Sequence, residues 1–112
     1  MSKSKPQSVL IIGINGGLAQ LTAKMLLQSN HQLKITGVDS RTIKDSINDP
    51  RVTYQQIKYA RNDFENLFRN NHFDSVIHLA RVTHSSTSAS AIEKRLEVNL
   101  IGTKMILDLC RR

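Results

Sequence analysis

Four short runs of apolar or β-branched residues recur along the chain. They are residues 8–13 (SVLIIG), 33–39 (LKITGVD), 52–57 (VTYQQI) and 74–80 (DSVIHLA). Runs of this length are typical of strands that are buried on both faces of a parallel sheet. The pattern therefore predicts four strands.

Helical patterns lie between most of these runs. Residues 17–30 place apolar side chains at helical spacing on one face. Those side chains are Leu18, Leu21, Met25 and Leu26. Residues 40–50 leave room for no more than a turn or two of helix.

Two further helices are expected later in the chain. The first has Asn62 as its candidate N-cap, with Glu65 three residues later. Its inward residues are Phe64, Leu67 and Phe68. Ser90 and Glu93 have the same capping-box spacing, and a long helical pattern follows them to Leu109.

The order of elements predicts an α/β fold. Strands that alternate with helices form a parallel sheet covered on both faces. Right-handed crossovers favour the strand order 3-2-1-4. The length of 112 residues fits one domain. We expect a disordered, solvated tail over residues 1–7 and the domain over residues 8–112.

Residues 11–20 (IIGINGGLAQ) join the first strand to the first helix and contain three glycines. The Asn-Gly pair also fits a hairpin, but the helical spacing that follows favours a strand-to-helix turn. Backbone N–H groups at a helix N-terminus favour an anion. Gly13 would permit the tight turn, Gly16 the approach of a pyrophosphate, and Ala19 close helix packing. Because residue 15 is Asn, the glycine spacing is not G-x-G-x-x-G. By itself, this glycine pattern also fits any tight strand–helix junction.

Asp39 ends the second strand, twenty residues after Ala19. A carboxylate at this place can accept hydrogen bonds from both ribose hydroxyls of an adenosine, and it would repel a 2′-phosphate. The sequence therefore favours NAD over NADP as the cofactor, and Arg41 would soften that preference. A helix cap or turn role for Asp39 stays open.

Four stretches resemble one known family. They are GINGGLA (13–19), GVDSR (37–41), VIHLAR (76–81) and EVNLIGTKMILDLC (97–110). In this order they resemble the extended short-chain dehydrogenase/reductase family, which comprises NAD-dependent sugar-nucleotide epimerases and dehydratases. The resemblance runs from Ser8 to Cys110 and implies a doubly wound, Rossmann-like fold.

The resemblance also implies a dinucleotide site. The residues implied to lie along the pyrophosphate are Gly13, Gly16, Gly17 and Leu18. Those implied to hold the adenosine ribose are Asp39, Ser40 and Arg41. Those implied to lie beside the nicotinamide ribose and its phosphate are Leu79, Ala80 and Arg81. Asn99 is implied to order the site from behind, and an amide within an apolar helix needs partners of this kind. His78 is expected to be a structural residue of its strand.

Two departures from the family pattern concern cofactor and chemistry. Lys58 stands where the family usually has an Asp that meets the adenine amine, and a charged lysine cannot accept a hydrogen bond. Tyr59 could still pack on the adenine. Tyr54 and Lys58 match the family's Tyr-x-x-x-Lys pair, but a strand would set them ~13 Å apart. We therefore assign no catalytic residue and no metal ligand within this chain.

Composition limits the alternatives. The formal charge of +7 comes from scattered basic residues, and two tyrosines and three phenylalanines offer little for stacking on bases, so we expect no nucleic-acid partner. The single Cys110 suits a reducing compartment. No early apolar run is long enough for a signal peptide or a membrane span, so we expect a cytoplasmic protein without a membrane partner.

The expected function is the NAD-binding portion of an NAD-dependent epimerase/dehydratase or reductase acting on a nucleotide-sugar-like substrate. The chain stops where a fifth strand is expected, so we expect a truncated domain without its catalytic pair. The alternative is a non-catalytic nucleotide-sensing or interaction domain. Two apolar stripes on the last helix predict a homo-oligomer. The stripes are Ile92, Leu96, Leu100 and Leu107, and Val98, Ile101, Met105 and Leu109.

Overall fold

The computed structural model describes residues 7–44, 46–80, 93 and 102–111. Its strands are β1 (Ser8–Ile12), β2 (Lys34–Asp39), β3 (Val52–Gln56) and β4 (Ser75–His78). Its helices are α1 (Gly17–Ser29), α2 (Arg61–Asn70) and α4 (Gly102–Cys110). Arg81, Ser90 and Asn99 lie outside the described residues, as do residues 1–6 of the expected tail.

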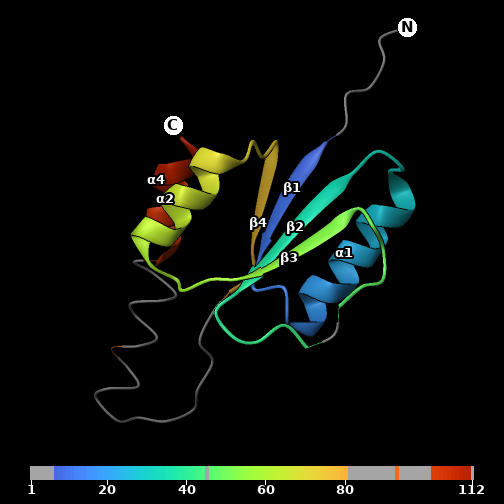
Figure 1. The fold of residues 1–112 in the computed structure, drawn as a ribbon, viewed down its shortest axis with the longest axis horizontal. Helices are drawn as coiled ribbons and strands as arrows, with labels where there is room; N and C mark the ends of the chain where they lie inside the picture. The colour runs from blue at the N-terminus through green and yellow to red at the C-terminus, as the bar shows by residue number, and fades with distance from the viewer. Residues whose placement is uncertain (1–6, 45, 81–92, 94–101, 112) are drawn as a thin grey trace, which may run out of the picture.

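The strands form one parallel sheet in the order β3-β2-β1-β4, which confirms the predicted order. β1 pairs on both sides, so that Ile12 stands between Val38 and His78. Helix α1 covers one face of the sheet, and α2 and α4 cover the other (Figure 1). The domain is therefore the doubly wound α/β fold that the sequence predicts, with β4 at one edge of the described sheet.

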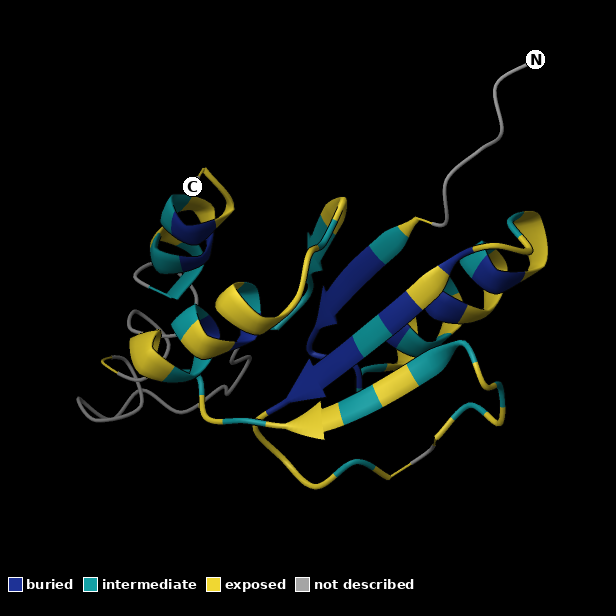
Figure 2. Ribbon diagram, turned by 45° about the horizontal axis from the view of Figure 1, so that its top comes forward, coloured by how far each residue is buried: buried dark blue, intermediate teal, exposed yellow. Residues whose placement is uncertain are grey.

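Side-chain alternation along β1 divides the core in two. Val9 and Ile11 pack on the side of α1, whereas Leu10 and Ile12 pack on the side of α2 and α4. β1 and β2 are the most buried strands of the sheet, and β3 is largely exposed or half-buried (Figure 2). Full burial of such a side chain contributes about 1.5–3 kcal/mol, so the centre of the sheet carries much of the stability.

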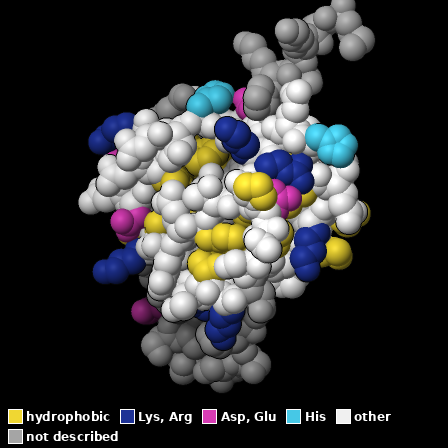
Figure 3. All heavy atoms as spheres, turned by 45° about the vertical axis from the view of Figure 1, so that its right-hand side comes forward, with side chains coloured by type: hydrophobic (Ala, Val, Ile, Leu, Met, Phe, Trp, Pro, Cys, Tyr) yellow, Lys and Arg dark blue, Asp and Glu magenta, His cyan; other side chains and the backbone are white. Residues whose placement is uncertain are grey.

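The face on which α1 packs differs from the one that the large apolar residues indicate. Leu18, Leu21 and Met25 share a side of the helix, but they are 66%, 55% and 61% exposed. The side against the sheet carries the buried residues Ala19, Ala23 and Leu27. Alanines face the strands because they let the helix approach the sheet closely. Hydrophobic side chains are visible between lysines and arginines when the α1 side of the molecule is brought forward (Figure 3).

Helix α2 begins two residues earlier than its capping pattern predicts. Its N-cap residue is Ala60, which makes no side-chain cap hydrogen bond, so the assignment of Asn62 as N-cap is wrong. Glu65 instead pairs with Arg61 one turn earlier, at 2.9 Å. The predicted inward face is confirmed, since Phe64 and Leu67 are buried.

The connection from β2 to β3 contains no helix in its described residues, 40–44 and 46–51, contrary to the expected short turn of helix. Side chains and backbone fix it instead. The backbone N–H of Ile47 donates to Tyr54 Oη at 2.6 Å. Arg51, paired with Asp49, donates to the carbonyls of Leu27 and Asn30 at the end of α1. These bonds tie the connection to β3 and to the carbonyls at the end of α1.

Gly13 is the residue at which the chain turns from β1 toward α1. Its φ is +90°, and a Cβ there would lie 2.7 Å from the backbone nitrogen of Ala80. Gly37 in β2 meets a comparable limit, because its Cβ would lie 2.6 Å from Ile14 Cγ1. Both positions therefore exclude a side chain for steric reasons, and Gly13 also for its backbone conformation. None of the helices within the described ranges has the length and apolar character to cross a membrane.

We expect Gly13→Ala to lower the free energy of unfolding by about 1–3 kcal/mol from backbone strain, with a further loss from the contact with Ala80. Gly17→Ala is the matched control. A Cβ at Gly17 meets nothing within 4 Å, and alanine is favoured over glycine within helices by up to about 1 kcal/mol. Chemical denaturation of both variants measures the difference. Equal stabilities would contradict the assigned role of Gly13.

Candidate functional site

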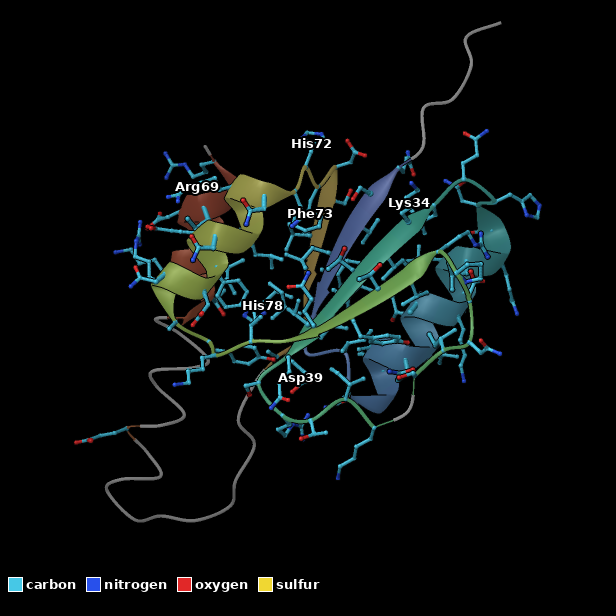
Figure 4. The ribbon with its side chains drawn as sticks, in the orientation of Figure 1. Lys34, Asp39, Arg69, His72, Phe73 and His78 are labelled. Atoms are coloured by element: carbon cyan, nitrogen blue, oxygen red, sulfur yellow. The ribbon has the colours of Figure 1, made fainter. Side chains whose placement is uncertain are left out.

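Three strand ends converge at the carboxyl edge of the sheet. The backbone N–H of Gly13 donates to the carbonyl of Val38 at 2.8 Å, and that of Leu79 donates to Ile12 at 2.8 Å. Asp39 and His78 lie at this edge, at the other end of the sheet from Lys34 (Figure 4). In open parallel sheets, ligands bind outside the carboxyl ends of the strands, where the strand order reverses. The ends of β1, β2 and β4 are therefore the candidate site.

The glycine loop presents backbone donors at this edge. Gly16 is the N-cap residue of α1, in extended conformation, and its N–H donates back to Gly13 at 3.1 Å. No side chain caps the helix, and its first turn carries no acidic residue. The first-turn N–H groups at Gly17 and Leu18 have no acceptor within the helix. With open space at Gly17, the loop can bind an anion through these donors.

Asp39 is the buried acid of the site, with only 1% of its surface exposed. Its Oδ2 accepts from the backbone N–H of Asn15 at 3.0 Å. Its Oδ1 accepts from the backbone N–H of Arg41 at 3.0 Å and from Arg41 Nε at 3.2 Å. The hydrogen bond and the charge of Asp39 raise the pKa of Arg41 above its usual value. The carboxylate thus joins the end of β2 to the glycine loop.

Asn15 is a structural contributor that sequence reasoning missed. Its Nδ2 donates to the carbonyl of Thr42 at 2.9 Å, and its Oδ1 accepts from the backbone N–H of Lys44 at 3.2 Å. Together with the bond to Asp39, these contacts fasten residues 42–44 to the glycine loop. A side-chain amide within a glycine-rich turn is a sequence feature that could have indicated this role. The partners of that amide are backbone groups, however, and these have no signature in the sequence.

Tyr59 and Ser40 meet beside Asp39. The pKa of Tyr59 is raised to about 12, mainly by burial and further by the negative charge of Asp39, whereas hydrogen bonding by Ser40 opposes the rise. The Tyr59 ring packs near that of Phe64, with centroids 5.9 Å apart. Lys58 is exposed next to it. The structure thus brings Asp39, Ser40, Arg41 and Tyr59 together, and it places Leu79 and Ala80 against the glycine loop from the other side.

Tyr54 lies elsewhere. It is within β3, and its hydroxyl accepts the bond from Ile47 described above. Lys58 follows the end of that strand and is exposed. Tyr54 and Lys58 therefore do not share a helix turn, where residues four apart are neighbours, and the expectation that they form no catalytic pair stays a prediction.

His78 connects the end of β4 to the start of α4. Its Nε2 lies 3.0 Å from Thr103 Oγ1, and its Nδ1 is buried without a hydrogen-bond partner in the described structure. Burial lowers the pKa of His78 below its usual value. The ring is therefore neutral near pH 7, which suits the structural role expected of it.

We expect the burial of His78 to make the fold acid-sensitive. Because its pKa is lower in the folded than in the unfolded state, the unfolded chain binds the proton first. The free energy of unfolding should fall as the pH drops below about 6.5 and level off below the folded pKa. His78→Gln should reduce this fall, while His31→Gln, at an exposed turn, should retain it. Thermal unfolding across this range is the measurement, and identical slopes in all three proteins would contradict the expectation.

Known proteins share this sequence and this fold. Residues 9–112 match the model of the NAD dependent epimerase/dehydratase family. The chain is 28% identical to a dTDP-D-glucose 4,6-dehydratase of Dictyostelium discoideum, over 94% of this chain and 26% of that protein. It is 25% identical to a trifunctional UDP-glucose 4,6-dehydratase/UDP-4-keto-6-deoxy-D-glucose 3,5-epimerase/UDP-4-keto-L-rhamnose-reductase of Arabidopsis thaliana, over 96% of this chain and 17% of that protein.

Two solved structures show the same arrangement. A short chain dehydrogenase of Leptospira borgpetersenii with bound NAD+ superposes with a TM-score of 0.80 at 17% identity, over 94% of this chain and 44% of that one. A UDP-glucose 4-epimerase of Bifidobacterium longum in complex with NAD+ and UDP superposes with a TM-score of 0.77 at 22% identity, over 94% of this chain and 33% of that one. The chain thus spans less than half of each of these relatives.

Proposed function

This chain belongs to the NAD-dependent epimerase/dehydratase family, and on that premise we propose that it is the NAD-binding portion of an epimerase, dehydratase or reductase acting on a nucleotide-sugar-like substrate. The observation that carries the proposal is the buried Asp39 carboxylate, held beside an uncapped helix N-terminus. One anion-binding element and one acceptor for ribose hydroxyls meet there, as a dinucleotide requires.

In this proposal, different residues of the described structure bind different parts of the cofactor. The N–H groups of Gly17 and Leu18 bind the pyrophosphate, and Asp39 accepts from the adenosine ribose. Tyr59 offers its ring to the adenine, and Leu79 and Ala80 lie beside the nicotinamide half. Bound NAD would supply the hydride acceptor, while these residues bind and orient it. The roles of Arg81 and Asn99 stay sequence predictions.

A nucleotide-sensing or interaction domain is the second candidate. Lys58 favours it, because this exposed cation stands where the family usually has the carboxylate that meets the adenine. Tyr54 supports it too, because this tyrosine, the one described tyrosine with a lysine four positions later, lies in β3 with its hydroxyl bonded to Ile47. Both candidates use the same dinucleotide site. A Ser and a Tyr-x-x-x-Lys pair after this segment in a longer protein would favour the enzyme over the sensing or interaction domain.

We expect calorimetric titration to show tighter binding of NAD than of NADP. Asp39→Ala should weaken NAD by about five- to a hundredfold, since two hydrogen bonds of about 0.5–1.5 kcal/mol each are lost. It should also remove the discrimination against NADP. Circular dichroism must show that the variant is folded, because Asp39 also holds the glycine loop. Tighter binding of NADP by the wild type would overturn the role of Asp39, and no binding of either cofactor would overturn the proposal.

We further propose that the chain self-associates through its C-terminal helix. Ile106 and Leu109 are buried against the core, whereas Leu107 between them is 59% exposed. α4 therefore has apolar residues on two sides and packs only one of them on the described core, as the two sequence stripes suggest. Residues 94–101 of the predicted interface lie outside the described structure.

Light scattering at high micromolar concentration should detect a species larger than a monomer. Leu107→Glu should shift it toward the monomer, because a charge in an apolar contact is costly. Leu21→Glu on α1 is the matched control, since Leu21 is similarly exposed on another helix. A monomeric wild type, or equal effects of the two substitutions, would count against the interface.

A further inference from the structure

Asp39 has fewer free acceptor positions than a ribose would use. The two oxygens of a carboxylate offer about four positions for hydrogen-bond donors. Three are taken, by the backbone N–H groups of Asn15 and Arg41 and by Arg41 Nε. A ribose that donates from both of its hydroxyls needs two. One of the existing bonds must therefore open when an adenosine ribose binds.

The bond that can open is the one from the Arg41 side chain. The Asn15 N–H is fixed, because the Asn15 side chain is itself bonded to Thr42 and Lys44. The Arg41 N–H belongs to the backbone that leaves β2. The guanidinium, in contrast, is carried by a side chain that is 70% exposed. Asp39 is buried, but the ribose hydroxyl replaces the lost donor while water solvates the released guanidinium, so this exchange has a small net cost.

We propose that the Arg41 side chain is a specificity-determining latch over the adenosine ribose site. This inference rests on the proposed function. Closed, the latch occupies the Asp39 Oδ1 position that a ribose hydroxyl needs. With NAD bound, the hydroxyl would take over that position, and the guanidinium would be released from Asp39.

The same movement gives Arg41 opposite effects on the two cofactors. For NAD the latch is a competitor, because its bond to Asp39 has to be broken. For NADP the released guanidinium is a ligand, because its charge and its fork of N–H donors suit a 2′-phosphate. Asp39 repels that phosphate, so the pair sets the preference between the cofactors by opposing contributions.

The test is calorimetric titration of NAD and NADP into wild type, Arg41→Ala and Lys44→Ala. Lys44 lies in the same loop, is exposed, and contacts Asn15 through its backbone only, so Lys44→Ala removes an equal charge and leaves Asp39 untouched. Arg41→Ala should bind NAD about two- to fivefold more tightly and NADP about fivefold or more weakly. Lys44→Ala should weaken the binding of both cofactors to the same extent, or leave the binding of both unchanged.

Added salt gives a second readout. The Arg41 guanidinium is exposed although Asp39 is buried, so salt screens their attraction in part. The difference in NAD affinity between wild type and Arg41→Ala should therefore shrink as salt is added. If wild type binds NAD and Arg41→Ala binds it no more tightly, the latch is wrong while the proposed function stands. If neither protein binds either cofactor although circular dichroism shows both folded, the proposed function fails and the latch with it.

Discussion

The left-handed turn at Gly13 is the constraint on which the rest of the structure depends. Its backbone touches that of Ala80 at the end of β4, and its N–H is bonded to Val38 at the end of β2. One residue thereby sets the spacing of three strand ends and the direction in which α1 leaves the sheet. The buried acid and the residues after β4 lie at this edge because the strands are parallel, and the turn at Gly13 places the open N-terminus of α1 beside them.

Asp39 links this architecture to the proposed function. A buried carboxylate is costly unless donors surround it, and here two backbone N–H groups and one guanidinium do so. The donors that stabilise the acid in the absence of a ligand are also the ones with which a ligand competes. The acid is therefore held by two backbone donors and one side-chain donor, and in our proposal a ribose replaces the side-chain donor.

The sequence predicted those features that depend on short-range pattern. The apolar and β-branched runs identified all four strands, and chain order with crossover handedness gave the sheet. The expected burial on both faces was wrong for β3, whose residues are exposed or half-buried. The packing face of α1 was wrong because periodicity weights large apolar side chains, whereas close approach to a sheet requires small ones such as Ala19 and Ala23. Asn15 was missed because its partners are backbone groups 27 and 29 residues away. No pattern of residue types records which carbonyl or N–H a side chain meets.

Charge explains why recognition at this site depends on so few residues. A formal charge of +7 from scattered basic residues would not distinguish one dinucleotide from another, even where it attracted phosphate groups. Discrimination requires a group that is fixed, desolvated and of the opposite sign. Among the described residues, Asp39 is the buried charged side chain, and its bonds to Asn15 and Arg41 fix it in place. Asp39 packs against the core on one side and is bonded to Arg41 on the other. A small displacement of that arginine would therefore change the local charge that a ribose or its phosphate meets in our proposal.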